Sequence, residues 1–151
     1  MARTNMFLNY DQSNQVLVSN ASSVWVTSSL MPELNRNDQY LLDLTVYSDP
    51  PTTANLASIN TSSFILTIGG LGADPVLTMD DATFDATNAA SGEISCEINT
   101  HSANLTAAIT TSTVKNYYAL IAGTDNAIGC SQVIAQFPVK IRNVVGTGST
   151  C

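Results

Sequence analysis

Charged residues are scarce in this chain. Only 11% of its residues are Asp, Glu, Lys or Arg, whereas an average globular protein has about a quarter. Five residues are Lys or Arg, and the formal net charge is −7. Because phosphate groups are bound by clustered cations, this composition argues against nucleic acid as a partner. The polar surface must consist mainly of neutral Ser, Thr, Asn and Gln side chains.

Long apolar runs are also missing. No run approaches the roughly 20 residues that a membrane-spanning helix needs. Residues 1–5, Met-Ala-Arg-Thr-Asn, lead straight into a strand-like segment without the apolar stretch of a secretory signal peptide. We therefore expect a soluble protein that is made in the cytoplasm and has no membrane partner.

Cysteine is too sparse for a disulfide framework. Cys96, Cys130 and Cys151 are the three cysteines, and none belongs to a Cys-x-x-Cys pair. Cys96 lies between Ile94 and Ile98 in an alternating segment, which predicts a small buried apolar side chain. A bridge between Cys96 and Cys130 is sterically possible but is disfavoured in a reducing cytoplasm. The state of Cys151 stays open.

The single histidine, His101, has Ser102 and Glu97 close in sequence but no Gly-x-Ser-x-Gly context for a nucleophile. We interpret it as a surface or helix-capping residue. Glu93 and Glu97 share one strand face at a spacing of about 13 Å, which exceeds both carboxylate separations used in glycoside hydrolysis. We therefore predict that the chain is not an enzyme, and we assign no catalytic, cofactor-binding or metal-binding residue.

An acidic loop spans residues 74–85 and contains four aspartates, Asp74, Asp80, Asp81 and Asp85. Their carboxylates are oxygen ligands of the kind that Ca²⁺ takes, but their spacing does not match an EF-hand loop. A solvated acidic turn is the simpler interpretation. Whether this loop binds calcium stays open.

Alternation of apolar and polar residues predicts strands. Within Tyr40–Tyr47, the residues Leu42, Leu44 and Val46 are expected to face a core, with Asp43 and Tyr47 on the other side. Further strands are expected at 6–10 and 16–18, which form an N-terminal hairpin, and at 63–69, 75–79, 82–84 and 92–99.

The last third of the chain predicts a long hairpin. Its arms, Tyr117–Ala122 and Val133–Ile141, flank the turn-forming segment 123–129. In the second arm, alternation places five residues on the core face, namely Val133, Ala135, Phe137, Val139 and Ile141. Pro138 has no N–H, so this arm is expected near a sheet edge or with a bulge.

These strands predict an all-β fold, an antiparallel β-sandwich that is immunoglobulin-like or jelly-roll-like. The period changes after residue 100, where Leu105, Ala108 and Ile109 indicate one short helix near 102–112. We expect a single domain over residues 1–145 and a flexible C-terminal tail at 146–151.

Four segments carry a resemblance to a known family. They are Thr4–Asn9, Gly92–Asn99 with the following Leu105–Ile109, Tyr117–Ile121 and Gln136–Asn143. Their order resembles bacteriophage and prophage tail proteins, most closely the N-terminal domain of baseplate upper proteins that carry receptor-binding parts. The resemblance covers about residues 4 to 145. It implies a β-sandwich that docks onto the virion, and it implies assembly without identifying a site.

The first hypothesis is therefore a virion structural protein of the tail, baseplate or fibre, made in the bacterial host cytoplasm. It would associate with itself as a homo-oligomer and dock to other virion proteins, through exposed strand edges or apolar patches around Pro138 or the N-terminal hairpin. A capsid decoration or coat protein is one alternative. Another is a carbohydrate-binding module built on Trp25, Tyr40, Tyr47, Tyr117 and Tyr118; exposure of these rings on one face would favour it, and burial would exclude it.

Overall fold

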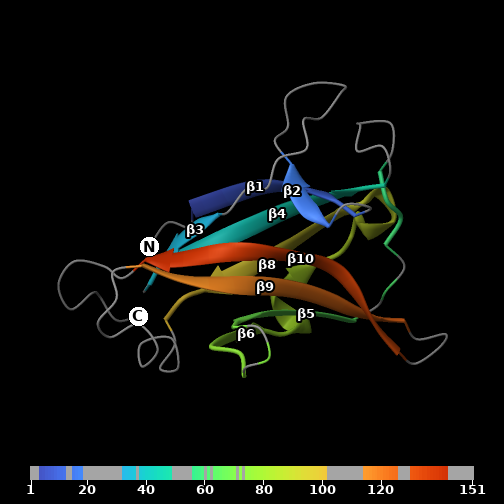
Figure 1. Cartoon of the computed structure of the whole chain (residues 1–151). Helices are drawn as coiled ribbons and strands as arrows, with labels where there is room; N and C mark the ends of the chain where they lie inside the picture. Colours follow the sequence, from blue (N-terminus) through green and yellow to red (C-terminus); the bar gives the residue numbers. More distant parts are fainter. Residues whose placement is uncertain are drawn as a thin grey trace.

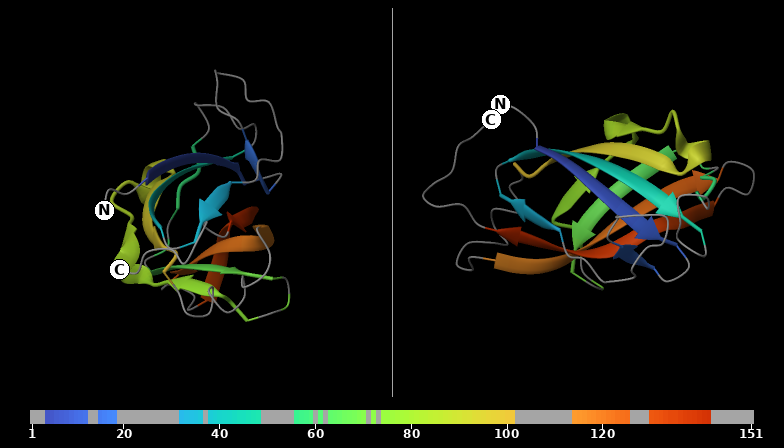
Figure 2. Two further views of the ribbon diagram at one scale, coloured as in Figure 1. Left: turned by 90° about the vertical axis from the view of Figure 1, so that its left-hand side faces the viewer. Right: turned by 90° about the horizontal axis from the view of Figure 1, so that it is seen from above.

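The fold consists of two five-stranded sheets packed face to face, as Figures 1 and 2 show. The computed structural model describes residues 4–12, 15–18, 32–36, 38–48, 56–59, 61, 63–70, 72, 74–101, 114–125 and 130–142. Seen end-on in the left panel of Figure 2, the strands curve around a common interior. The prediction of an all-β sandwich is confirmed.

The first sheet has the strand order β2-β1-β4-β8-β7. β1 (Thr4–Asp11) and β2 (Val16–Val18) form the predicted N-terminal hairpin, and β1 pairs on its other side with β4 (Gln39–Tyr47). β8 (Glu93–Asn99) and the two-residue β7 (Phe84–Asp85) complete the sheet. The outer strands are thus very short, while β1, β4 and β8 carry most of the sheet.

The second sheet has the strand order β3-β10-β9-β5-β6. Its centre is the predicted hairpin of β9 (Val114–Asp125) and β10 (Cys130–Arg142). β5 (Ser63–Gly69) and β6 (Leu77–Met79) lie beside β9, and β3 (Glu33–Asn35) lies beside the end of β10. Two single 3₁₀ turns, η1 (Asp81–Thr83) and η2 (Ala89–Ser91), flank β7.

The core fills the space between the sheets with aliphatic and aromatic side chains. β4 contributes Leu42, Leu44 and Val46, each at most 1% exposed, as its alternation predicts. β8 contributes Ile94, Cys96 and Ile98, again as predicted. The second sheet supplies a matching set of buried residues, namely Phe64, Leu66, Ile68, Ala119, Ile121, Ala135, Phe137, Val139 and Ile141.

Two pairs of neighbouring strands are parallel, whereas the sequence predicts antiparallel pairs throughout. β1 runs parallel to β4, with Thr4 opposite Tyr40, and β3 runs parallel to β10, with Glu33 opposite Lys140. The chain crosses to the second sheet at β3 before it returns to the first at β4. Because this crossover joins segments that no local turn connects, hairpin patterns in the sequence do not reveal it.

A β-bulge changes which residues of β10 face the core. The register shifts between Val133, opposite Ala122, and Ala135, opposite Ile121, so Ile134 is the additional residue. Ile134 is buried, but Val133 is 60% exposed. The prediction that Val133 shares the core face with Ala135 is therefore wrong. The bulge lies before Pro138, which is itself in regular register opposite Tyr118.

Pro138 lies where its missing N–H costs no bond to β9. Gln136 donates its N–H to the Tyr10 hydroxyl at 3.3 Å, and Lys140 donates to the Pro32 carbonyl at 2.9 Å. Both groups point away from β9, and Pro138 lies midway between them in the alternating strand. On that side β3 covers only Lys140–Arg142. Pro138 thus occupies a locally exposed edge, as its chemistry predicts.

The far end of β4 departs from the alternation of its sequence. Tyr47 was expected on the exposed side of β4, but it is 6% exposed and packs against Val18. The alternation of β4 alone does not show that Val18, on a strand beyond β1, packs against this end of β4. The predicted helix near 102–112 and the tail at 146–151 lie outside the described residues.

Thr100 fastens the corner where the chain passes from one sheet to the other. This residue has no exposed surface. Its Oγ1 accepts the N–H of Asp38 at 2.7 Å and donates to the carbonyl of Asn35 at 2.7 Å. The hydroxyl of Tyr40, on β4, accepts the N–H of Asn35, on β3, at 2.6 Å across this corner. Side chains therefore hold the corner between β3 and β4. Between these two strands the backbone passes from one sheet to the other and belongs to neither.

We expect Thr100→Val to lower the free energy of unfolding by about 2 kcal/mol, because the buried polar groups at the corner lose their hydrogen-bond partner without a change in side-chain volume. Urea denaturation followed by fluorescence measures the loss. The matched control is Thr100→Ser, which keeps the hydroxyl and should retain most of the stability. Equal losses in the two variants would mean that the methyl group, rather than the hydroxyl, holds the corner.

Candidate interaction surfaces

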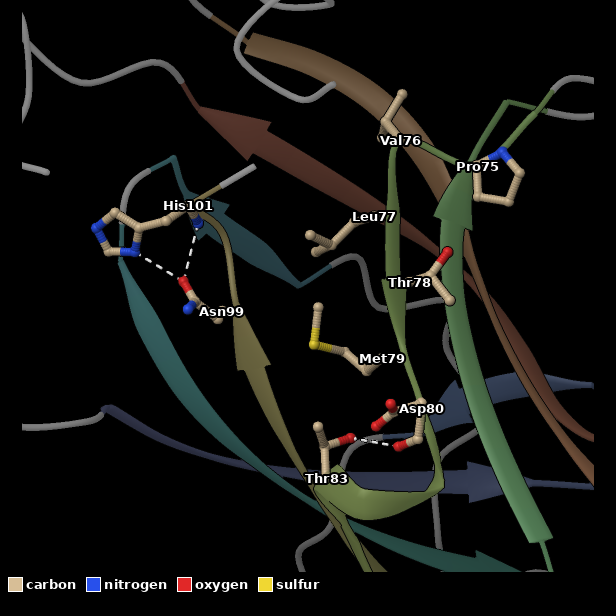
Figure 3. Close-up of a pocket in the computed structure, with 9 residues that line it drawn as sticks. All are labelled: Pro75, Val76, Leu77, Thr78, Met79, Asp80, Thr83, Asn99 and His101. Atoms are coloured by element: carbon tan, nitrogen blue, oxygen red, sulfur yellow. Dashed lines mark hydrogen bonds between the residues drawn. The ribbon is translucent and has the colours of Figure 1, made fainter. Parts of the chain in front are cut away.

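A hollow of about 500 Å³ lies between β6 and the end of β8. In Figure 3, Leu77 and Met79 extend from β6 toward it, while the imidazole of His101 is directed away from β6 and lies far from Asp80. Thr83, at the base of the hollow, donates its hydroxyl to the Asp80 carbonyl at 2.8 Å. No nucleophile and base therefore meet among the residues that line it.

His101 is fixed by the neighbouring Asn99. Its backbone N–H donates to Asn99 Oδ1 at 2.9 Å, and its ring Nδ1 lies 2.7 Å from the same oxygen. An amide oxygen only accepts, so Nδ1 carries the hydrogen of this contact. Nε2 is buried, and among the described residues it has no hydrogen-bond partner. His101 is thus half-buried and closes a local turn; its predicted capping of a helix concerns residues outside the described ones.

Two carboxylates of the acidic loop accept hydrogen bonds within the fold. Asp81 accepts the backbone N–H of Phe64 at 2.9 Å. Asp85 accepts both the N–H and the hydroxyl of Thr87, at 3.0 and 2.7 Å, and these bonds lower the pKa of Asp85. Among the described residues, no three His, Cys, Asp or Glu side chains are grouped so that they could hold a metal ion.

The outer side of the first sheet carries four carboxylates, Asp43, Asp85, Glu93 and Glu97, and we call it the acidic face. Cross-strand pairing aligns Phe7 with Asp43, Asp43 with Ser95, and Ser95 with Asp85. Two hollows of about 320 and 480 Å³ adjoin this row. Glu93 and Glu97 do share one exposed face, as predicted, and Ser95 separates them.

The rings proposed as a sugar-stacking platform do not gather on one surface. Tyr40, Tyr47 and Tyr117 are buried, with exposed fractions of 4 to 6%. Tyr118 is 40% exposed on the second sheet, and Trp25 lies outside the described residues. Burial of three of the five rings removes the platform on which the carbohydrate-binding hypothesis was built.

The outer side of the second sheet is apolar at its centre, and we call it the apolar face. Pairing places Val133 beside Ala122 and Ile65, and Pro138 beside Tyr118, with Leu120 on β9 between these two rows. Its members are at least partly exposed, and they are Ile65, Tyr118, Leu120, Ala122, Val133 and Pro138. Next to Tyr118 and Leu120 a hollow of about 200 Å³ opens toward Gly69.

The sequence contains a signal for this face that alternation hides. Residues 117–122 read Tyr-Tyr-Ala-Leu-Ile-Ala without a polar interruption. A strand with apolar residues at every position has no polar side to offer to solvent. Such a run predicts that both sides of β9 are apolar, one facing the core and the other facing a partner or solvent.

Cys96 is a free, buried thiol. Its Sγ lies 3.4 Å from the Thr83 hydroxyl and 3.6 Å from the Glu97 carbonyl. Burial raises the pKa of this thiol to about 11, because the thiolate loses its hydration in the core. The prediction of a small buried residue is confirmed.

Stability should therefore fall as pH rises above 9. In the unfolded chain the thiol loses its proton near its ordinary pKa of about 8.5 to 9, whereas the folded protein keeps the proton until about pH 11. The unfolded state then binds fewer protons, so alkali favours unfolding by about 1 kcal/mol between pH 8 and pH 10. Urea denaturation at both pH values measures this loss. Cys96→Ala should show a smaller loss over the same interval, and an unchanged loss would assign the effect to other groups.

Within the described part of the chain, no helix is long and apolar enough to cross a membrane. No protein-family model matches this chain, and no match is found among curated proteins.

Proposed function

We propose that this chain is a structural protein of a bacteriophage virion, in the tail, baseplate or fibre, made in the bacterial host cytoplasm. It functions through self-association and through docking to other virion proteins. The observation that carries the proposal is the apolar face, where partly exposed side chains of β5, β9 and β10 adjoin on one side of a sheet. Apolar patches on a folded surface mark sites of contact with other molecules.

Three further features support this reading. The order of strand segments resembles phage tail proteins. The apolar face lies beside Pro138, one of the two places where an assembly contact is expected from the sequence. Charges on the described part of this face are few, because its rows consist of aliphatic, aromatic and neutral polar residues up to Lys140. A neutral apolar patch suits a permanent protein contact better than recognition of a charged ligand.

Peptide mass spectrometry of phage particles purified from the source culture tests the proposal. We expect the chain to be recovered with the particles in stoichiometric amount, and its copy number against the major capsid protein separates a tail component from a capsid decoration or coat protein. Recovery only in the soluble fraction would overturn the proposal, and a glycan-binding screen would then be the next experiment.

Substitutions on the apolar face test whether this face is needed for incorporation into the particles. Tyr118→Lys places a charge at the centre of the face and should reduce incorporation into particles at least about tenfold, the effect of about 1.4 kcal/mol in a binding equilibrium. Glu97→Gln, on the acidic face of the other sheet, is the matched control and should be incorporated like the unaltered chain. A thermal melt of both variants checks that folding is retained.

A further inference from the structure

We infer that two copies of this chain associate through the outer edge of β1, whose Thr4–Leu8 segments pair antiparallel across a two-fold axis and join two first sheets into one. This inference rests on the proposed function, of which it names the self-association contact. It concerns a different surface from the apolar face, which remains available for docking to other proteins.

The outer edge of β1 is only partly covered. β2 pairs with Asn9, Tyr10 and Asp11, so within the described residues Thr4–Leu8 has a strand neighbour on the β4 side alone. The Asp11 carbonyl accepts the Gln15 N–H at 2.8 Å and so points toward the β2 side. Backbone direction alternates along a strand, which turns the N–H and C=O groups of Asn5 and Phe7 to that same open side.

Side-chain exposure agrees with this reading of the backbone. Phe7 is 72% exposed, the largest fraction among the large hydrophobic residues that the structure describes, and Asn5 is also exposed. In Figure 1, β1 lies at the margin of the upper sheet, next to the short β2. An aromatic ring therefore stands beside backbone groups that no strand among the described residues pairs.

The other long strands with partly open edges each carry a feature that discourages pairing with another chain. β10 has Pro138 and the bulge after Val133, and the Gln136 N–H is already bound by Tyr10. On β5, the Phe64 N–H is bound by the Asp81 carboxylate.

β8 also carries residues that discourage pairing with another chain, whereas the Thr4–Tyr10 segment of β1 does not. Along its open edge β8 presents Glu93 and Glu97, whose charges oppose pairing with another acidic chain. Thr4–Tyr10 contains no charged residue and no proline. Natural sheets usually protect exposed edges, so an uncharged, aromatic edge without protection is the one suited to a partner strand.

A second copy fits this edge better than a strand of unrelated chemistry. The whole chain has a net charge of −7, so two copies repel each other over most of their surfaces. The Thr4–Tyr10 segment of β1 is uncharged, and antiparallel pairing of two identical neutral segments brings no like charges together. Such a contact is isologous, as a two-fold dimer requires.

The alternation of backbone groups selects one register. With Met6 opposite the second copy's Met6, Asn5 lies opposite Phe7 of the other copy, and Phe7 lies opposite Asn5. Both residue pairs use the groups that point outward, which makes four hydrogen bonds. The two Phe7 rings then occupy diagonal positions on the same sheet surface, within reach of each other. A register shifted by one residue would put the apolar side chains of one copy on the same sheet surface as the polar side chains of the other.

Sedimentation equilibrium of the full chain over a concentration series tests the inference. We expect a monomer–dimer equilibrium, with slower hydrogen exchange at the Asn5 and Phe7 amides as the dimer fills. Phe7→Lys should weaken the dimer at least about tenfold. Asn5→Pro should do the same, since it removes an outward N–H and leaves the ladder to β4 intact. Ile65→Lys, on the apolar face, reports any dimerisation through that face. Thr78→Lys, at an exposed position of β6, is the matched control and should dimerise normally.

A chain that stays monomeric at all concentrations overturns the inference, as does a dimer that Ile65→Lys dissociates and Phe7→Lys does not. Protection of the Asn5 and Phe7 amides only in assembled particles also overturns it, because the occupant of the edge is then a different protein. A monomeric chain that is recovered in particles discards this contact and keeps the proposed function. A dimer that is absent from particles keeps this contact and discards the proposed function.

Discussion

Leu66→Ala is expected to lower the free energy of unfolding by about 3 kcal/mol. Leu66 has no exposed surface, and on β5 it lies between Ile121 on β9 and Met79 on β6. Truncation removes the apolar contacts of the side chain and leaves a cavity between two sheets that cannot collapse around it, because both are held by backbone ladders. Urea denaturation at pH 7 measures the loss.

The neighbouring residue supplies the control. Ile65 precedes Leu66 on the same strand but is 42% exposed on the apolar face. Ile65→Ala removes a similar amount of side chain without creating a cavity, and the expected loss is about 1 kcal/mol or less. Similar losses at both positions would contradict the assignment of the two sides of β5. Leu66→Ala and Ile65→Ala together distinguish the stability contributed by a core side chain from that contributed by a side chain on the apolar face.

Gly92→Ala is expected to cost about 3 kcal/mol or more. Gly92 ends the 3₁₀ turn before β8 with a φ of 81°, a conformation that costs an ordinary L-residue about 1 to 2 kcal/mol. An added Cβ would also lie 2.7 Å from the Val46 carbonyl oxygen and 2.9 Å from that of Ala57. Since the Gly92 carbonyl accepts the Val46 N–H at 2.8 Å, relief of the clash would pull apart the contact between β4 and the start of β8.

Gly72 provides the matched comparison because it has a similar φ of 70°, and no atom of the described residues lies within 4 Å of an added Cβ. Gly72→Ala therefore isolates the backbone strain, and we expect a loss of about 1 kcal/mol. Thermal and urea denaturation of the two variants measures the difference between them. An equal loss would show that the close approach of β4 to Gly92 relaxes without cost.

Local alternation predicts much of this fold, and its failures have physical reasons. The core faces of β4 and β8 follow directly from their sequences, because one side of each strand meets the interior. Val133 departs from the pattern because one additional residue reverses the sides of the strand before it. The parallel pairing of β1 with β4 is a long-range crossover that no turn sequence encodes.

The candidate surfaces could be predicted only in outline. The sequence pointed to Pro138 and the N-terminal hairpin, and the apolar face and the β1 edge lie at these two places. What it could not show is which edges are covered, since the short β2 and β3 reach their neighbours from distant parts of the chain. Burial of Tyr40 and Tyr117 likewise depends on the opposite sheet.

The parallel pairing of β3 with β10 also has a consequence during translation. Glu33 cannot pair with Lys140 until Lys140 has been synthesised, which at ordinary translation rates is roughly 5 to 20 seconds later. Over that interval the second sheet stays open, while the uncharged β1 is already synthesised. Nascent chains on one messenger are neighbours throughout this delay. The contact that we propose between the β1 strands of two copies would therefore have time to begin before either chain has finished folding.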